Sequence, residues 1–308
     1  MLRPIQRFSR VPWIAALACL LVSCGVNEVD PTATLPSPTS TAQPSATLTA
    51  TPFQPSPTPV ALVATVNGEP ITLAEFQMEV ARFQASLESE ESVFEGNVEE
   101  QVLEDMITEQ LLAQSAEQNG YLVDEALIQE RFSGLVAQIG GDQAMTAWLA
   151  ANGYDEVSFR AALSRAIAAA WMRDQIIATI PQEVEQVHAR QILVFTSADA
   201  QEALAQLQAG RDFATLAATY DPLKICDLGW FPRGYLTQSE LEEAAFALEP
   251  GEHSEIIETA LGYHLLQVIE RDPQHTLDPE ARLILQEKAL NEWVENQREQ
   301  SVIEIMNQ

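Results

Sequence analysis

Three short motifs between residues 226 and 264 decide the fold of this chain. They read Cys226-Asp227-Leu228-Gly229-Trp230-Phe231, Phe246-Ala247-Leu248-Glu249-Pro250-Gly251 and Gly262-Tyr263-His264. The first motif indicates a tight bend at glycine within an apolar run. The second indicates a short amphipathic helix that ends at proline and glycine, and the third begins a strand that carries one histidine. Three motifs in a fixed order are far more specific than any one of them.

The segment around these motifs, residues 187–271, has an α+β pattern. Apolar and polar residues alternate in the runs predicted as strands, whereas the helical runs carry apolar residues three and four positions apart. Asp212 caps one helix, and Thr237 with Glu240 forms a capping box for another. The expected strands are His188–Phe195, Ser254–Ile257 and Tyr263–Ile269, and the expected helices are Ala198–Gln208, Phe213–Tyr220 and a run that ends near Leu248.

The residues before this segment predict a helical module that opens with a strand. Leu62–Val66 has a short strand pattern and is followed by a turn at Asn67-Gly68. Thr72 and Glu75 form a capping box at the start of the first helix. Four more helices are expected: about Asn97 to Asn119, one after Asp124, Asp142 to Ala151, and one from Asp155 that stops before Pro181.

The residues after the segment predict a last helix behind Pro279 and a tail strand at Val302–Met306. We expect this helix to return to the N-terminal module and the tail strand to pair with residues 62–66. The chain would then consist of a discontinuous domain, 61–181 completed by 278–308, into which a second domain, 182–273, is inserted.

The N-terminus has the pattern of a targeting segment. Residues 1–23 place arginines before an apolar core, Trp13 to Val22, which is too short to span a bilayer. The segment ends at Leu21-Val22-Ser23-Cys24, which resembles the lipobox of bacterial lipoproteins, where the cysteine is lipidated. An ordinary signal peptide that happens to contain Cys24 is the alternative.

A linker is expected over residues 24–60. Its stretch 31–59 holds eight Pro, eight Thr and four Ser and no charged residue, so it cannot bury a core. Such a composition predicts an extended tether of about 3 Å per residue.

Composition excludes several classes of function. The chain has 45 acidic and 16 basic residues and no basic cluster, which argues against nucleic-acid binding. Cys19 would leave with the signal and Cys24 would carry lipid, so Cys226 has no partner for a disulfide. The histidines lack the spacing of metal ligands and no glycine-rich phosphate loop is present, so neither a metal nor a cofactor is expected.

Taken with the strand from His188 to Val194, the three motifs resemble the parvulin family of peptidyl-prolyl isomerases. The resemblance implies a four-stranded antiparallel sheet with surrounding helices and an enzyme that isomerises X-Pro bonds. The helical module, opened by the run Val66-Asn67-Gly68-Glu69-Pro70-Ile71-Thr72, resembles the N-terminal chaperone region of SurA/PrsA-type folding factors. Isomerisation breaks no covalent bond, so it requires neither a nucleophile nor a metal.

The resemblance also implies two groups of site residues. The apolar cradle for the proline ring falls on Leu228, Phe231, Leu236, Leu241 and Phe246, with Leu241 offset by one position from the family's aromatic. The polar network falls on His264 and Thr259, with Gln191 where the family has its first histidine and Asp221 as the acid nearest to the family's Cys or Asp. Cys226 occupies a different position, and packing is its expected role.

These departures leave two functions open. The first is a lipid-anchored extracytoplasmic isomerase and chaperone whose partners are unfolded or newly exported polypeptides with X-Pro segments. The second is a holdase chaperone with a degenerate parvulin domain, which Gln191 and a loop between Tyr220 and Asp227 about four residues shorter than the family pattern favour. A surface lipoprotein that binds small molecules has no motif in its support.

Overall fold

The computed structural model describes residues 60–89, 94–220 and 226–306 of the chain. These residues form two compact units. One comprises the described residues up to Gln110 together with 123–167 and 302–306, and the other comprises 111–122 and 168–301. Within the described ranges, none of the helices is both long enough and apolar enough to cross a bilayer. The predicted signal peptide, Cys24 and nearly all of the linker lie outside the described residues.

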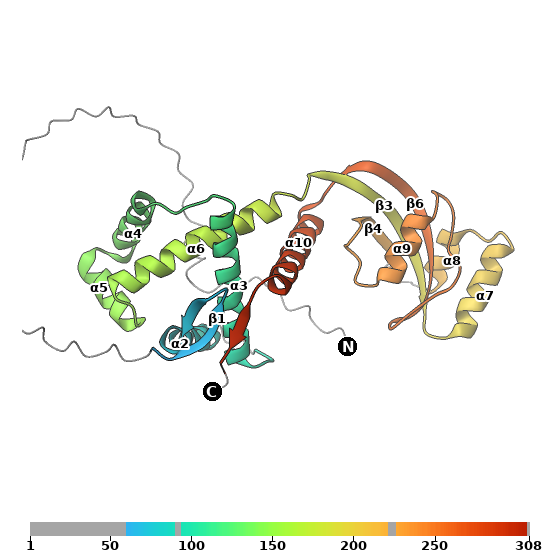
Figure 1. Cartoon of the computed structure of the whole chain (residues 1–308). Helices are drawn as coiled ribbons and strands as arrows, with labels where there is room; N and C mark the ends of the chain where they lie inside the picture. The colour runs from blue at the N-terminus through green and yellow to red at the C-terminus, as the bar shows by residue number, and fades with distance from the viewer. Residues whose placement is uncertain (1–59, 90–93, 221–225, 307–308) are drawn as a thin grey trace, which may run out of the picture. The chain divides into compact units, whose positions relative to one another are not determined.

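The first unit contains a three-stranded antiparallel sheet in the order β2-β1-β7. Strand β1, Leu62–Val66, turns into β2, Glu69–Thr72, through Asn67 and Gly68, which both have positive φ. Strand β7, Ile303–Ile305, pairs with the other edge of β1 and places Ala64 opposite Ile305. The predicted pairing of the tail strand with residues 62–66 is therefore confirmed (Figure 1). Strand β2 is not among the predicted strands, because its four residues show no alternation.

Five helices follow, close to the expected positions. The capping box of the first is confirmed, since Thr72 Oγ1 accepts from the Glu75 amide at 3.2 Å and the Glu75 carboxylate accepts from the Thr72 amide at 3.1 Å. Asp124 caps another by accepting from the Leu127 amide at 2.7 Å. The helices are α2 Leu73–Ser89, α3 Val98–Gln118, α4 Glu125–Ile139, α5 Asp142–Ala151 and α6 Glu156–Ile177.

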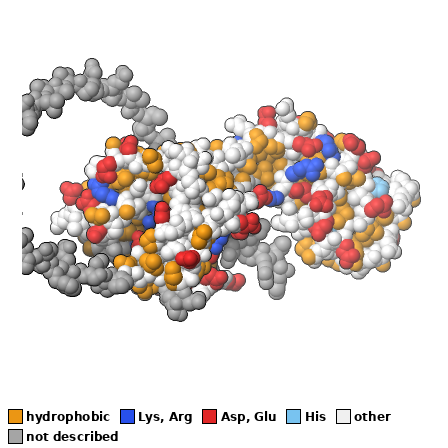
Figure 2. Space-filling view, viewed as in Figure 1, with side chains coloured by type: hydrophobic (Ala, Val, Ile, Leu, Met, Phe, Trp, Pro, Cys, Tyr) orange, Lys and Arg blue, Asp and Glu red, His pale blue; other side chains and the backbone are white. Residues whose placement is uncertain are grey.

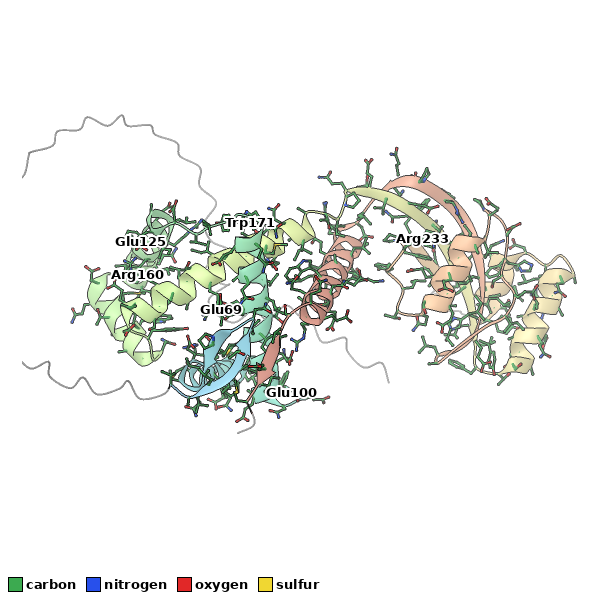
Figure 3. All side chains as sticks on the ribbon, in the orientation of Figure 1. Glu69, Glu100, Glu125, Arg160, Trp171 and Arg233 are labelled. Carbon is green, nitrogen blue, oxygen red and sulfur yellow. The ribbon has the colours of Figure 1, made fainter. Side chains whose placement is uncertain are left out.

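Helices α4 and α5 and the first half of α6 share an apolar core that includes Phe132, Met145 and Phe159. An ion pair closes its edge, because Arg160 on α6 lies 3.1 Å from Glu125 on α4 (Figure 3). The guanidinium also lies over the Phe132 ring, 4.5 Å from its centroid. The predicted apolar stripes of these helices are thus used for packing among themselves.

The second unit contains a four-stranded antiparallel sheet in the order β4-β3-β6-β5. The α+β class and the four-stranded sheet that the sequence implied are confirmed. The two central strands are longer than predicted and form a ribbon that reaches Glu183 and Thr276. The strands are β3 Glu183–Val194, β4 Asp227–Pro232, β5 Ile257–Thr259 and β6 Gly262–Thr276.

One predicted strand is wrong. The sequence predicts a strand from Ser254 to Ile257, whereas β5 begins only at Ile257. The cause is the Ser254 side chain, whose Oγ accepts the backbone N–H of Leu266 at 2.9 Å in place of a backbone carbonyl. The ladder is interrupted there, and only an isolated bridge between His253 and Gln267 precedes it.

Helices cover both faces of this sheet. Helices α7, Ser197–Gln208, and α8, Phe213–Tyr220, pack on one face, and α9, Ser239–Ala247, packs on the other (Figure 1). The predicted Asp212 cap is confirmed by a 2.9 Å bond from the Thr215 amide. The capping box at α9 is wrong, since Gln238 is the N-cap residue and makes no side-chain cap bond.

Helix α10, Pro279–Glu299, begins with Asp278 as its cap, which accepts from the Ala281 amide at 2.8 Å. It belongs to the same compact unit as the four-stranded sheet, 111–122 and the end of α6. The unit that contains α10 therefore includes two short pieces of the 61–181 segment, residues 111–122 and 168–181. The boundaries at 181 and 273 stay predictions.

The acidic excess is spread over the surface. In the space-filling view, carboxylate side chains are dispersed among apolar and polar ones on the visible face (Figure 2). Such dispersion agrees with a solvated anionic surface rather than with one acidic binding patch.

Candidate functional site

The glycine bend in the first motif fixes how β4 presents its side chains. Gly229 has φ +68°, and its amide donates to the Asp227 carboxylate at 2.9 Å. Asp227 also lies 2.8 Å from Nε2 of His188 on β3, so the bend is tied to the neighbouring strand. After the bend, Phe231 is buried against α9 whereas the Trp230 ring stacks on His275, with centroids 4.2 Å apart.

The loop after β4 is held by one carboxylate. Glu242 on α9 accepts the backbone amides of Gly234 at 2.7 Å, Tyr235 at 3.0 Å and Leu236 at 3.1 Å. Three converging N–H donors make a compact anion nest, and charge-assisted bonds of this kind are stronger than neutral ones. Glu242 therefore fixes the backbone that carries Leu236, although no sequence motif pointed to it.

The five predicted cradle residues gather on the α9 face of the sheet. Phe231, Leu241 and Phe246 belong to the buried core there, with exposed fractions of 0, 4 and 5%. Leu228 and Leu236 are half-buried and pack against the same core. Only the latter two present surface that a proline ring can contact, while the three buried residues support them from beneath.

The polar residues on the same face form a chain of hydrogen bonds. Nδ1 of His264 lies 2.9 Å from Oε1 of Gln191, and Nε2 lies 2.9 Å from Oγ1 of Thr259. The three side chains come from β6, β3 and β5, and the register places His264 between Leu193 and Ile257. The structure thus brings together three of the four predicted polar site residues.

The charge state of this network follows from its burial. His264 is 1% exposed, and burial lowers its pKa below the usual range for histidine. A neutral imidazole that donates from Nδ1 to Gln191 accepts at Nε2 from the Thr259 hydroxyl, which satisfies both ring nitrogens. Gln191 and Thr259 are half-buried, so they are the members of the network that an approaching chain can reach.

The remaining predicted residues fall elsewhere. Asp221 lies outside the described residues. Cys226 packs against the core of α7 and α8 on the opposite face of the sheet, and its carbonyl accepts the Gln191 amide at 2.7 Å. Within the described part of the chain, no group of three or more His, Cys, Asp or Glu side chains is placed to hold a metal ion.

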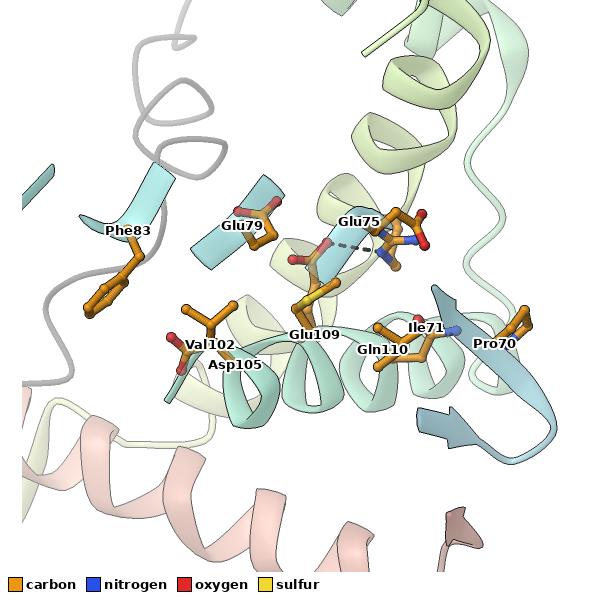
Figure 4. Close-up of a pocket in the computed structure, with 11 residues that line it drawn as sticks. Pro70, Ile71, Glu75, Glu79, Phe83, Val102, Asp105, Glu109 and Gln110 are labelled. Atoms are coloured by element: carbon orange, nitrogen blue, oxygen red, sulfur yellow. Dashed lines mark hydrogen bonds and ion pairs between the residues drawn. The ribbon is translucent and has the colours of Figure 1, made fainter. Parts of the chain in front are cut away.

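A separate small cavity lies inside the first unit, between β2, α2, α3 and α6 (Figure 4). Its volume is about 30 Å³, which suits roughly one water molecule. Arg165 pairs with Glu109 at 3.3 Å at this cavity, and burial raises the pKa of both Glu109 and Asp105.

Two parts of the chain match known families. Residues 181–282 match the family described as the PPIC-type PPIase domain, and residues 47–173 match the SurA-like N-terminal domain. The first match contains the whole four-stranded sheet, and the second contains β1, β2 and most of the helical module.

Relatives match different lengths of the chain. The chain is 27% identical over 243 residues to the foldase protein PrsA of Caldanaerobacter subterraneus, a match covering 67% of this chain and 72% of that protein. It is 44% identical over 91 residues to PrsA of Halalkalibacterium halodurans, covering 28% of this chain and 27% of that protein. It is 34% identical over 143 residues to the chaperone SurA of Thiobacillus denitrificans, covering 40% of this chain and 33% of that protein.

The second and third matches span a third or less of those relatives. The family matches carry the conclusion, because each coincides with one structural part described above. The chain therefore combines a SurA-like N-terminal domain with a peptidyl-prolyl isomerase domain of the parvulin, or PPIC, type.

Proposed function

We propose that this protein is an extracytoplasmic peptidyl-prolyl isomerase and chaperone that assists the folding of exported polypeptides. The observation that carries this proposal is the shared face of the four-stranded sheet, where Leu228 and Leu236 lie on the same side as the Gln191–His264–Thr259 network. Residues 182–273 would be the catalytic domain, and residues 61–181 with 278–308 would hold client chains.

The geometry suits isomerisation by selective binding of the twisted amide. Rotation about an X-Pro bond crosses a barrier near 20 kcal/mol, about the same as for any peptide bond. An apolar surface lowers the cost of losing amide resonance, and a fixed polar network orients the neighbouring carbonyl. Here the half-buried leucines supply the surface, and the Thr259 hydroxyl and Gln191 amide, held by a buried neutral His264, supply the polar contacts.

Isomerisation of a short X-Pro peptide by the full chain, followed by exchange NMR, tests this function. Exchange well above the uncatalysed rate is expected, with a clear loss in Leu236→Ala. Cys226→Ala is the matched control, because Cys226 packs on the opposite face of the sheet and should leave the rate unchanged. No acceleration at high protein concentration would refute the enzyme function.

The alternative is a holdase that keeps the fold without the catalysis. Gln191 favours it, because an amide cannot change charge as the family's histidine can. The holdase would be supported if the protein suppressed aggregation of a denatured client but left X-Pro exchange at its uncatalysed rate. Gln191→His separates the two further, since a gain in exchange rate would show that the network limits catalysis.

We also propose that the mature protein is anchored by lipid on Cys24. The support is the Leu-Val-Ser-Cys run at residues 21–24 behind an apolar core of ten residues. Incorporation of labelled fatty acid into the full-length protein in a bacterial host tests the anchor. Cys24→Ala should abolish the label, whereas retained label in that variant would refute the assignment.

A further inference from the structure

Phe195 is the most exposed large apolar side chain among the described residues. It exposes 80% of its surface and directly follows the last residue of β3. A single exposed apolar residue carries little meaning by itself. Its position relative to the polar network is what makes it informative.

Phe195 continues the row of β3 side chains that faces the network. Side chains two apart on a strand share one face, so Gln191 and Leu193 lie in one row, and Phe195 follows just beyond the end of β3. The glycine at 262 confirms the direction, because a Cβ there would lie 3.2 Å from Cδ1 of Leu193 and 3.6 Å from Cδ1 of Phe195. Gly262 is two residues before His264 on β6 and therefore lies on the same face.

Gly262 has no side chain, so the backbone beside the Phe195 ring is uncovered. Its φ is +138°, and a Cβ at this position would lie only 2.6 Å from the Val194 carbonyl oxygen, so a side chain is excluded. On β5, Thr259 lies opposite Gly262. Leu261, which is 41% exposed, donates its amide to the Thr259 hydroxyl at 3.1 Å.

We propose that Phe195 forms an apolar subsite, with the backbone at Gly262 as its floor, for an apolar side chain flanking the proline of a client. The proposal rests on the proposed binding of X-Pro segments at the sheet face. An extended client advances about 3.3 Å per residue. Phe195 is four residues from Gln191 along the chain, so the client side chain that reaches the ring lies within about four residues of the proline.

The chemistry of the side chains around the subsite indicates which kind of client residue it would bind. Gln191, Leu193 and Phe195 carry no charge, and the subsite is continuous with the Thr259 end of the network. An apolar client residue gains by leaving water here, whereas a charged residue would lose hydration without gaining a partner. The subsite therefore selects X-Pro segments with an apolar neighbour, as unfolded chains expose.

The test compares two sets of peptides on the full chain. One set carries phenylalanine or leucine at one of the four positions on either side of Xaa-Pro, and the other carries alanine there. Phe195→Ala should lower kcat/KM, or binding by chemical-shift titration, about tenfold for the best apolar-flanked peptide and less than twofold for the alanine peptides. Phe195→Leu should retain most of the preference.

Gln208→Ala is the control, because Gln208 is exposed and lies on α7, which packs on the face of the sheet opposite the subsite. An equal loss for both peptide sets, or no loss for the apolar set, overturns the subsite while the proposed function stands. Failure of the unaltered chain to bind or isomerise any peptide overturns both.

Discussion

The nest around Glu242 makes a quantitative prediction. Its carboxylate accepts three backbone amides, from Gly234, Tyr235 and Leu236, at 2.7–3.1 Å. A hydrogen bond to a charged group contributes about 1.5–3 kcal/mol when buried. The three amides belong to half-buried residues, so water replaces part of each bond, and about 1 kcal/mol per bond is a fair net value.

Glu242→Ala should therefore lower the free energy of unfolding of the second unit by about 2–3 kcal/mol, or its Tm by roughly 5–10 °C. The loop that carries Leu236 should loosen as well, which raises KM for X-Pro peptides more than it lowers kcat. Differential scanning calorimetry and exchange NMR measure the two effects. Glu242→Gln keeps one acceptor oxygen, so its loss in free energy of unfolding should be about half that of Glu242→Ala.

Glu243→Ala is the matched control, because this neighbour on α9 is exposed. The reasoning is refuted if the two alanine variants have Tm values within about 2 °C of each other. A loss of stability without any change in KM would show that the nest supports α9 alone and does not position Leu236.

Three further predictions concern other contacts. Burial lowers the pKa of His264 in the folded state, so as the pH falls the unfolded chain takes up the proton first, and stability should decrease below about pH 6.5. Denaturant midpoints measured at pH 7.5 and 5.5 should therefore differ less in His264→Gln than in the unaltered chain. Arg271 donates to the carbonyls of Phe246 at 2.8 Å and Leu248 at 2.7 Å at the end of α9; Arg271→Ala should cost about 1–3 kcal/mol by calorimetry, and an unchanged Tm would contradict this role. Deletion of 302–308 removes β7 and should lower the Tm of the first unit, whereas deletion of 307–308 should not; equal Tm values would show that β7 adds no stability.

The sequence predicted the elements whose signals are local. The cap at Asp212 and the capping box at Thr72 are read from side chains within one helical turn, and both are present. The pairing of the tail with β1 is a long-range contact, yet the strand patterns at residues 62–66 and 302–306 predicted it. Gln191 and Thr259 were placed by family motifs alone, and the structure brings both to His264.

The errors arose where a side chain replaces a backbone partner. Ser254 has a strand-like neighbourhood, but its hydroxyl takes the hydrogen bond that a strand carbonyl would accept, and alternation in the sequence does not reveal this. Glu242 was overlooked for a related reason, because its three donors are backbone amides in a loop six to eight residues earlier. Nothing in side-chain identity marks such an acceptor.

The pairing of β1 with β7 has a consequence for synthesis. Thr65 and Glu304, opposite each other in the sheet, are separated by 239 residues. A chain that emerges from its N-terminus must keep β1 with one unpaired edge until the last strand arrives, and unpaired edges invite pairing with other chains. Truncated copies would retain that open edge permanently. A protein proposed to guard other chains against aggregation is thus itself vulnerable to aggregation until β7 is made.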